Sequence, residues 1–85
     1  KAFKDYTLTT AKKREYIERG IAAEDSALAL HGDYIEALTY KNILLRMKAL
    51  MEKDRKTIDA LINEADRLRN RAMELQKTQG GGGGI

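Results

Sequence analysis

The stretch "ALALHGDYIEAL", residues 27–38, decides the fold because it joins two apolar helical runs through a short polar turn. Gly32 can end a helix in the left-handed conformation, since it has no Cβ atom to clash. Asp33 then fits the N-cap of the next helix, and Glu36 stands three residues later, at the capping-box position. Two helices joined by so few residues lie side by side and antiparallel. The stretch therefore predicts a helical hairpin.

The spacing of apolar residues predicts three helices, at residues 10–30, 34–53 and 57–77. The apolar stripe of residues 34–53 is wider than the other two, so we expect this helix to pack on both sides. Residues 1–9 are expected to be the end of a preceding helix and a threonine-rich loop, and residues 79–85 a flexible glycine-rich tail. The predicted fold class is all-α, built from antiparallel helical hairpins.

Length and composition exclude several classes of protein. A chain of 85 residues makes at most one small domain. Without cysteine it forms neither disulfides nor thiolate zinc sites, so the sequence does not indicate whether the protein works in an oxidising or a reducing compartment. Its apolar runs fall far short of the roughly 20 residues that cross a bilayer, so we expect no direct membrane insertion.

Catalytic motifs are also missing from the sequence. His31 is the single histidine, so neither a two-histidine metal site nor a histidine-based relay can form within the chain. In a turn, His31 is expected to be solvated. The segment "QGGGGGI" at residues 79–85 lacks the GK[ST] ending of a phosphate loop and follows a helix instead of leading into one. We therefore expect no enzyme activity, no cofactor and no metal.

The basic residues are interspersed with acidic ones. The net charge of +3 comes from 16 basic and 13 acidic residues. The segment "AKKRE" at residues 11–15 and the pair Arg67 and Arg71, one helical turn apart, could contact phosphates. Nucleic-acid binding favours a continuous basic stripe with aromatic neighbours. These basic patches are interrupted by Glu15, Glu18, Glu64, Asp66 and Glu74. A solvated face is the favoured interpretation, with no nucleic-acid partner expected, and a nucleic-acid-binding helical domain stays an alternative.

An internal repeat links the first and the third predicted helix. The segment "YIERGIAAEDSALAL" from Tyr16 aligns with "LINEADRLRNRAMEL" from Leu61 at a shift of 45 residues. In this alignment small residues match small residues, Gly20 with Ala65 and Ala27 with Ala72. Because close helix crossings need small side chains, we predict that Ala27 and Ala72 are buried at such crossings.

These small residues, seven positions apart in the second helix of each hairpin, resemble the tetratricopeptide repeat (TPR). The joint around Gly32 is similar to the joint between TPR units, with glycine where proline usually stands. Lys41 and Asn42 replace the usual Leu-Gly pair, and the period of about 45 exceeds the family's 34 residues. The chain resembles most the C-terminal end of bacterial repeat proteins with lengthened hairpins.

The resemblance implies that residues 10–78 are a TPR-like α-solenoid fragment, the terminal part of a longer solenoid. Its function would be that of a non-catalytic scaffold for a protein partner or for neighbouring repeats. In TPR hairpins the first helix lines the partner groove. Carried onto this chain, the resemblance assigns that groove to Glu36, Thr39, Ile43, Arg46 and Met47. Arg46 would contribute a charge-assisted bond and Met47 an adaptable apolar contact. The alternative is that Ile43 and Met47 are ordinary core residues.

A second resemblance covers the last two predicted helices. "GDYIEALTYKNILL" followed by "ADRLRNRAMELQ" is similar to the second and third helices of the microtubule-interacting-and-trafficking domain. That resemblance implies a three-helix, peptide-binding bundle of about this size. It leaves the internal repeat unexplained and stays an alternative.

Overall fold

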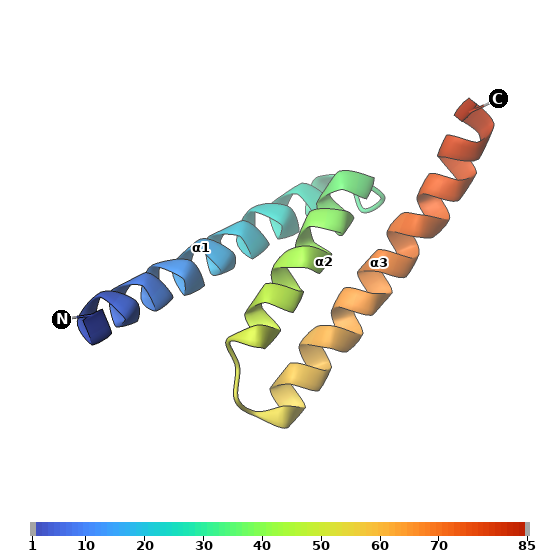
Figure 1. The fold of residues 1–85 in the computed structure, drawn as a ribbon. Helices are drawn as coiled ribbons and strands as arrows, with labels where there is room; N and C mark the ends of the chain where they lie inside the picture. Colours follow the sequence, from blue (N-terminus) through green and yellow to red (C-terminus); the bar gives the residue numbers. More distant parts are fainter. Residues whose placement is uncertain (1, 85) are drawn as a thin grey trace.

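The chain folds into three helices in a computed structural model that describes the backbone of residues 2–84 and the side chains of residues 9–78. The helices are α1 (Ala2–Leu30), α2 (Ile35–Leu50) and α3 (Arg55–Gly84) (Figure 1). Each helix runs antiparallel to the next, and the backbone described contains no strand. The prediction of an all-α fold built from helical hairpins is confirmed.

Two of the helices are longer than the sequence predicts. α1 runs without interruption from Ala2, so the threonine-rich stretch expected to be a loop is helical. α3 continues through the glycines at 80–84, beyond the end predicted near residue 77. Extending an existing helix adds a backbone hydrogen bond for each residue that is ordered, whereas starting a new one is costly. Thr and Gly are poor helix formers. They can still be helical at these positions, because they extend helices that are already formed.

The turn between α1 and α2 differs from the predicted cap. The N-cap residue of α2 is Tyr34, and no side chain caps this helix. A backbone hydrogen bond from Tyr34 N to the carbonyl oxygen of His31, 3.1 Å long, closes the turn. Gly32 does not have a positive φ angle. The predicted left-handed glycine and the Asp33–Glu36 capping box are therefore wrong, because backbone bonds alone close this turn.

A side-chain cap stands instead at the start of α3. The Asp54 carboxylate accepts hydrogen bonds from the backbone N–H of Thr57 at 3.0 Å and from its hydroxyl at 2.8 Å. The Asp54 carbonyl accepts a further bond, 2.9 Å long, from the N–H of Ile58. Asp54 therefore satisfies donors that the first helical turn would otherwise leave unpaired.

α2 is the central element of the fold. It packs against α1 on one side and against α3 on the other, whereas α1 and α3 diverge and do not pack on each other over the described residues (Figure 1). This arrangement confirms that α2 packs on both sides. The molecule is elongated, with extents of 57 × 23 × 23 Å. The buried apolar side chains are those of Ile17, Ala37, Leu38, Leu44, Leu45, Ala49, Ala65 and Ala72.

Small residues allow the close approaches between helices, but not at every predicted position. Ala65 and Ala72 on α3 are buried, as expected for Ala72. Ala27 on α1 is half-buried, so the tight crossing predicted there is not found. The close approach of α1 to α2 occurs at Gly20, where an added Cβ atom would lie 2.8 Å from Leu44 Cδ1. The difference arises because α1 diverges from its neighbours, so packing does not follow its whole apolar stripe.

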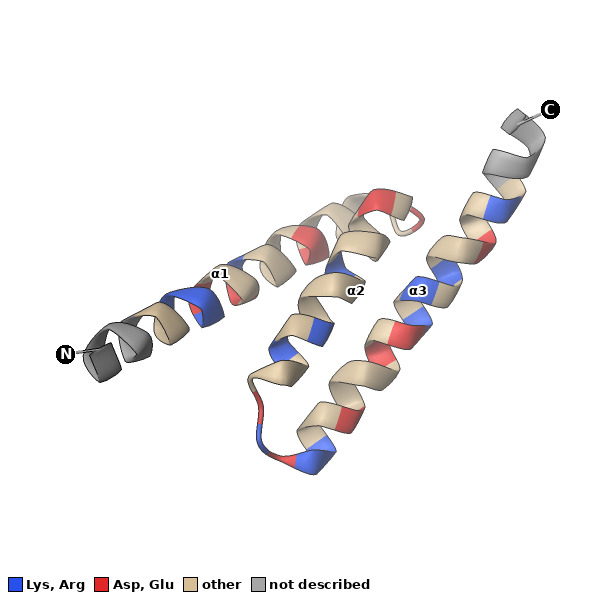
Figure 2. Ribbon diagram, viewed as in Figure 1, with Lys and Arg blue, Asp and Glu red and all other residues tan. Residues whose placement is uncertain are grey.

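One half-buried cation links all three helices. Lys41 of α2 lies with its Nζ 2.6 Å from Asp25 Oδ1 on α1 and 3.3 Å from Glu64 Oε2 on α3. Burial disfavours the charged ammonium, but the hydrogen bonds and charges of both carboxylates outweigh it and raise the pKa of Lys41 above its ordinary value. Lys41 departs from the TPR pattern, and here it joins α1 to α3 through α2. Figure 2 shows blue and red segments interspersed along α1 and α3, whereas α2 is red only at its N-terminal end and blue further along.

Candidate partner-binding face of α2

The outward side of α2 is the candidate site. The fully buried residues of this helix point to α1 or α3 and are Ala37, Leu38, Asn42, Leu44, Leu45 and Ala49. At 100° per residue, most of the other positions fall on the opposite side of the helix. Lys41 and Lys48 lie instead on the packed side, where they pair with neighbouring helices. We call the opposite side the outer face, and it carries Glu36, Thr39, Tyr40, Ile43, Met47 and Leu50.

The outer face is mostly apolar although it is exposed. Tyr40 is 51% exposed, Ile43 44% and Leu50 87%, and Met47 beside them is half-buried. A helix side without neighbouring helices normally carries charged and polar residues. Isolated exposed apolar residues are common, but a contiguous row along one helix typically marks a surface that another molecule covers.

The structure brings four of the five predicted site residues together on this face. Glu36, Thr39 and Ile43 are exposed there, and Met47 is half-buried beside them. Ile43 is therefore not a core residue, contrary to the alternative interpretation. Tyr40 and Leu50 belong to the same face but were not predicted, because α2 is apolar nearly all round and periodicity could not distinguish its open side.

Arg46, the fifth predicted residue, lies at the edge of the face and is already bonded. Its Nε donates to Asn42 Oδ1 at 2.7 Å, and its Nη2 donates to Asp66 Oδ1 of α3, also at 2.7 Å. This hydrogen bond, with the positive charges of Arg46 and Arg69 nearby, lowers the pKa of Asp66 although partial desolvation opposes the shift. The structure thus gives Arg46 a role in holding α2 to α3.

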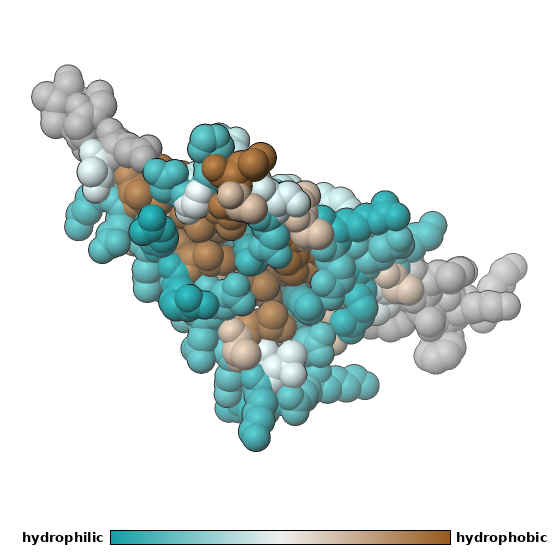
Figure 3. Space-filling model, turned by 180° about the vertical axis from the view of Figure 1, so that it is seen from behind, coloured by the Kyte–Doolittle hydropathy of each residue, from teal (hydrophilic) through white to brown (hydrophobic). Residues whose placement is uncertain are grey.

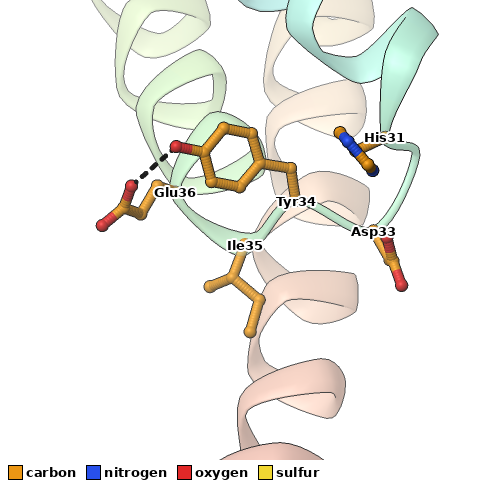
Figure 4. A pocket seen from close by; sticks show the side chains of 5 residues that line it. All are labelled: His31, Asp33, Tyr34, Ile35 and Glu36. Atoms are coloured by element: carbon orange, nitrogen blue, oxygen red, sulfur yellow. Dashed lines mark hydrogen bonds between the residues drawn. The ribbon is translucent and has the colours of Figure 1, made fainter.

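A shallow pocket of about 380 Å³ lies at the N-terminal end of α2 (Figure 4). The phenol of Tyr34 donates a hydrogen bond to Glu36 Oε1, 3.0 Å long. That bond, together with the negative charge of Glu36, raises the pKa of Tyr34. His31 and Asp33 lie on the other side of the turn from this pair, so the lining side chains do not converge on one point (Figure 4). The hydrogen bond from Tyr34 orients Glu36 at the start of the outer face.

A second apolar surface lies on the back of the molecule. Figure 3 shows hydrophobic atoms in the middle of that view, between hydrophilic edges. Apolar residues of α1 and α3 such as Ile21, Leu28 and Leu61 are half-buried, whereas Tyr40 and Ile43 on the outer face of α2 are exposed.

Metal and membrane sites were sought in the same part of the chain. Over the side chains described, no three His, Cys, Asp or Glu residues gather in a way that could hold a metal ion. His31 is exposed, as predicted. Of the helices as described, none combines the length and apolarity required to span a bilayer.

Comparison with known proteins adds no family assignment. No protein-family model matches the sequence, and neither the curated proteins nor the solved structures yielded a match.

Proposed function

We propose that this chain is a non-catalytic, helical interaction scaffold that binds a protein partner through the outer face of α2. The observation that carries the proposal is the row of exposed apolar side chains at Tyr40, Ile43 and Leu50. Protein interfaces combine such an apolar centre with a polar rim. Glu36 and Thr39 supply polar groups at one end of this row.

The TPR resemblance supports the same face. In that family the first helix of a hairpin contacts the partner, and α2 is the first helix of the α2–α3 hairpin. The burial of Ala65 and Ala72 on α3 is what such a repeat requires of its second helix. More specifically, we propose that the chain is part of a bacterial solenoid in which neighbouring repeats pack against it.

The alternatives have less support. A microtubule-interacting-and-trafficking-like module is a closed three-helix bundle, but α1 and α3 do not pack on each other over the described residues. Nucleic-acid binding would need available basic side chains. About half of the basic side chains described are instead engaged in ion pairs with carboxylates, among them those of Arg14, Arg19, Lys41, Arg46, Lys48 and Arg55. Arg67 and Arg71 form no ion pair in this part of the chain, but Glu64, Asp66 and Glu74 lie close to them in the sequence.

Site-specific photo-crosslinking in the producing cells tests the proposal. A photoreactive phenylalanine analogue replaces Ile43, and in a matched control it replaces Ala60, an exposed residue of α3. We expect discrete protein adducts from position 43, identified by mass spectrometry, and their loss when Tyr40→Glu is added. Equal labelling from both positions, or adducts from position 60 alone, contradicts a partner on the outer face.

A further inference from the structure

The two ends of the outer face of α2 carry charged residues of opposite sign. Glu36 and the neighbouring Asp33 lie at its N-terminal end, and both are exposed. Lys13 and Lys53 lie at the other end, where they line one surface depression together with Leu50. None of these four charged groups forms an ion pair within the described part of the chain. Asp33 and Glu36 thus make one end of the face acidic. At the other end Lys13 and Lys53 carry positive charge, with Glu52 and Asp54 next to Lys53 in the sequence and Glu52 paired with Arg14.

Such a face is complementary to the same face of a second copy whose α2 runs in the opposite direction. Ile43 stands midway between Glu36 and Leu50, seven residues from each. A twofold axis through Ile43 therefore brings the acidic end of one α2 to the basic end of the other. The same operation sets Tyr40 beside Met47 on one flank, a favourable pairing of aromatic ring and thioether. An isologous interface requires this kind of self-complementarity.

We propose that the partner of the outer face is a second copy of this chain, bound with its α2 antiparallel. The inference rests on the proposed function, because it names the occupant of the same face. In Figure 1, α1 passes behind α2 and α3 runs beside it. Ile43 meets its own counterpart at the axis, and Glu36 lies near Lys13 and Lys53 of the second copy.

Sedimentation velocity of the full chain over a wide concentration range tests the proposal. We expect a reversible monomer–dimer equilibrium. Ile43→Arg should abolish the dimer, because two guanidinium groups would meet at the axis, whereas Ala60→Arg on α3 should leave it unchanged. Circular dichroism and thermal melting of each variant verify that the helices are retained.

A charge exchange distinguishes the second copy from any other partner. Glu36→Lys and Lys53→Glu, each alone, should weaken the dimer about 10-fold, since two symmetry-related contacts become repulsive. Glu36→Lys combined with Lys53→Glu should restore most of the affinity. In a dimer of this chain, position 36 of one copy faces position 53 of the other, so the double variant again places opposite charges at each contact. A different partner protein would not carry the compensating change.

Several outcomes overturn this inference. If the chain stays monomeric at every concentration, the dimer proposal is wrong. If position 43 then crosslinks to a different protein, the proposed function still holds. A dimer that tolerates Ile43→Arg places the contact elsewhere. Failure of the double variant to recover overturns the antiparallel pairing.

Discussion

Asp54 has a local role that the neighbouring acids do not share. Its carboxylate accepts two hydrogen bonds from Thr57 at the start of α3, whereas Asp33 makes no cap at the start of α2. Asp54→Ala should therefore lower the free energy of unfolding by about 1 kcal/mol. Asp33→Ala, the matched control, should change it by less than about 0.5 kcal/mol. Urea denaturation measures the free energy of unfolding of both variants. If Asp33→Ala is the more destabilising of the two, Asp33 does cap α2.

Gly20 is a position at which α1 approaches α2 closely. A side chain there would enter the space of Leu44, which is itself buried. Gly20→Leu should cost roughly 1–3 kcal/mol through overpacking, even though leucine is the better helix former. Ala23→Leu, at an exposed position of the same helix, should be nearly neutral. Thermal melting followed by circular dichroism compares the two, and equal midpoints would show that the crossing has room.

At the scale of the elements, Lys41 connects α1 and α3 through its ion pairs with Asp25 and Glu64. Lys41→Ala removes the cation between Asp25 and Glu64, so two carboxylates then face each other across α2. We expect the separation of α1 and α3 to increase. Because the chain has no cysteine, Ser26→Cys with Arg67→Cys gives a specific pair of spin labels for pulsed electron resonance.

The control for this measurement is Lys48→Ala. It removes the pair with Glu18, which joins α1 to α2 but does not reach α3. If the label distances in the Lys41 variant match those of the parent, packing on α2 alone holds the helices apart.

The contact between α2 and α3 should depend on pH through Asp66. Its pKa in the folded chain lies below the ordinary value of 3.8, chiefly because Arg46 donates to the carboxylate. A lowered folded pKa means that this contact stabilises the fold above about pH 3.8, and that its contribution is lost as the pH falls through the folded pKa. In Arg46→Gln, the carboxyl carbon of Asp66 should titrate at a higher pH by NMR. Lys77→Gln should leave the titration of Asp66 as in the parent.

For the whole molecule, the central position of α2 predicts the order of local stability. Amides open most rarely where packing surrounds a helix, and α2 alone has a neighbour on each of two sides over the described residues. Hydrogen exchange followed by mass spectrometry should therefore find the slowest amides in residues 38–49. Slower exchange in the first half of α1 than in α2 would contradict this arrangement.

The sequence by itself determined the helices and their hairpins, because these depend on interactions between residues close in the chain. The spacing of apolar residues marked each helix, and the interruption at Gly32 marked the first reversal of direction. The alignment that pairs Gly20 with Ala65 and Ala72 with Ala27 also identified three positions of close packing or burial out of four.

Only the tertiary structure decided which side of α2 is open and which polar groups are occupied. Tyr40 and Leu50 are exposed because α1 and α3 both pack on the opposite side, a fact that the sequence of α2 does not contain. Arg46 turns from the outer face to Asp66, which lies 20 residues further along the chain. Exposure and ion pairing depend on the directions in which whole helices cross. Those directions follow from packing summed over many distant residues, and no local pattern specifies them.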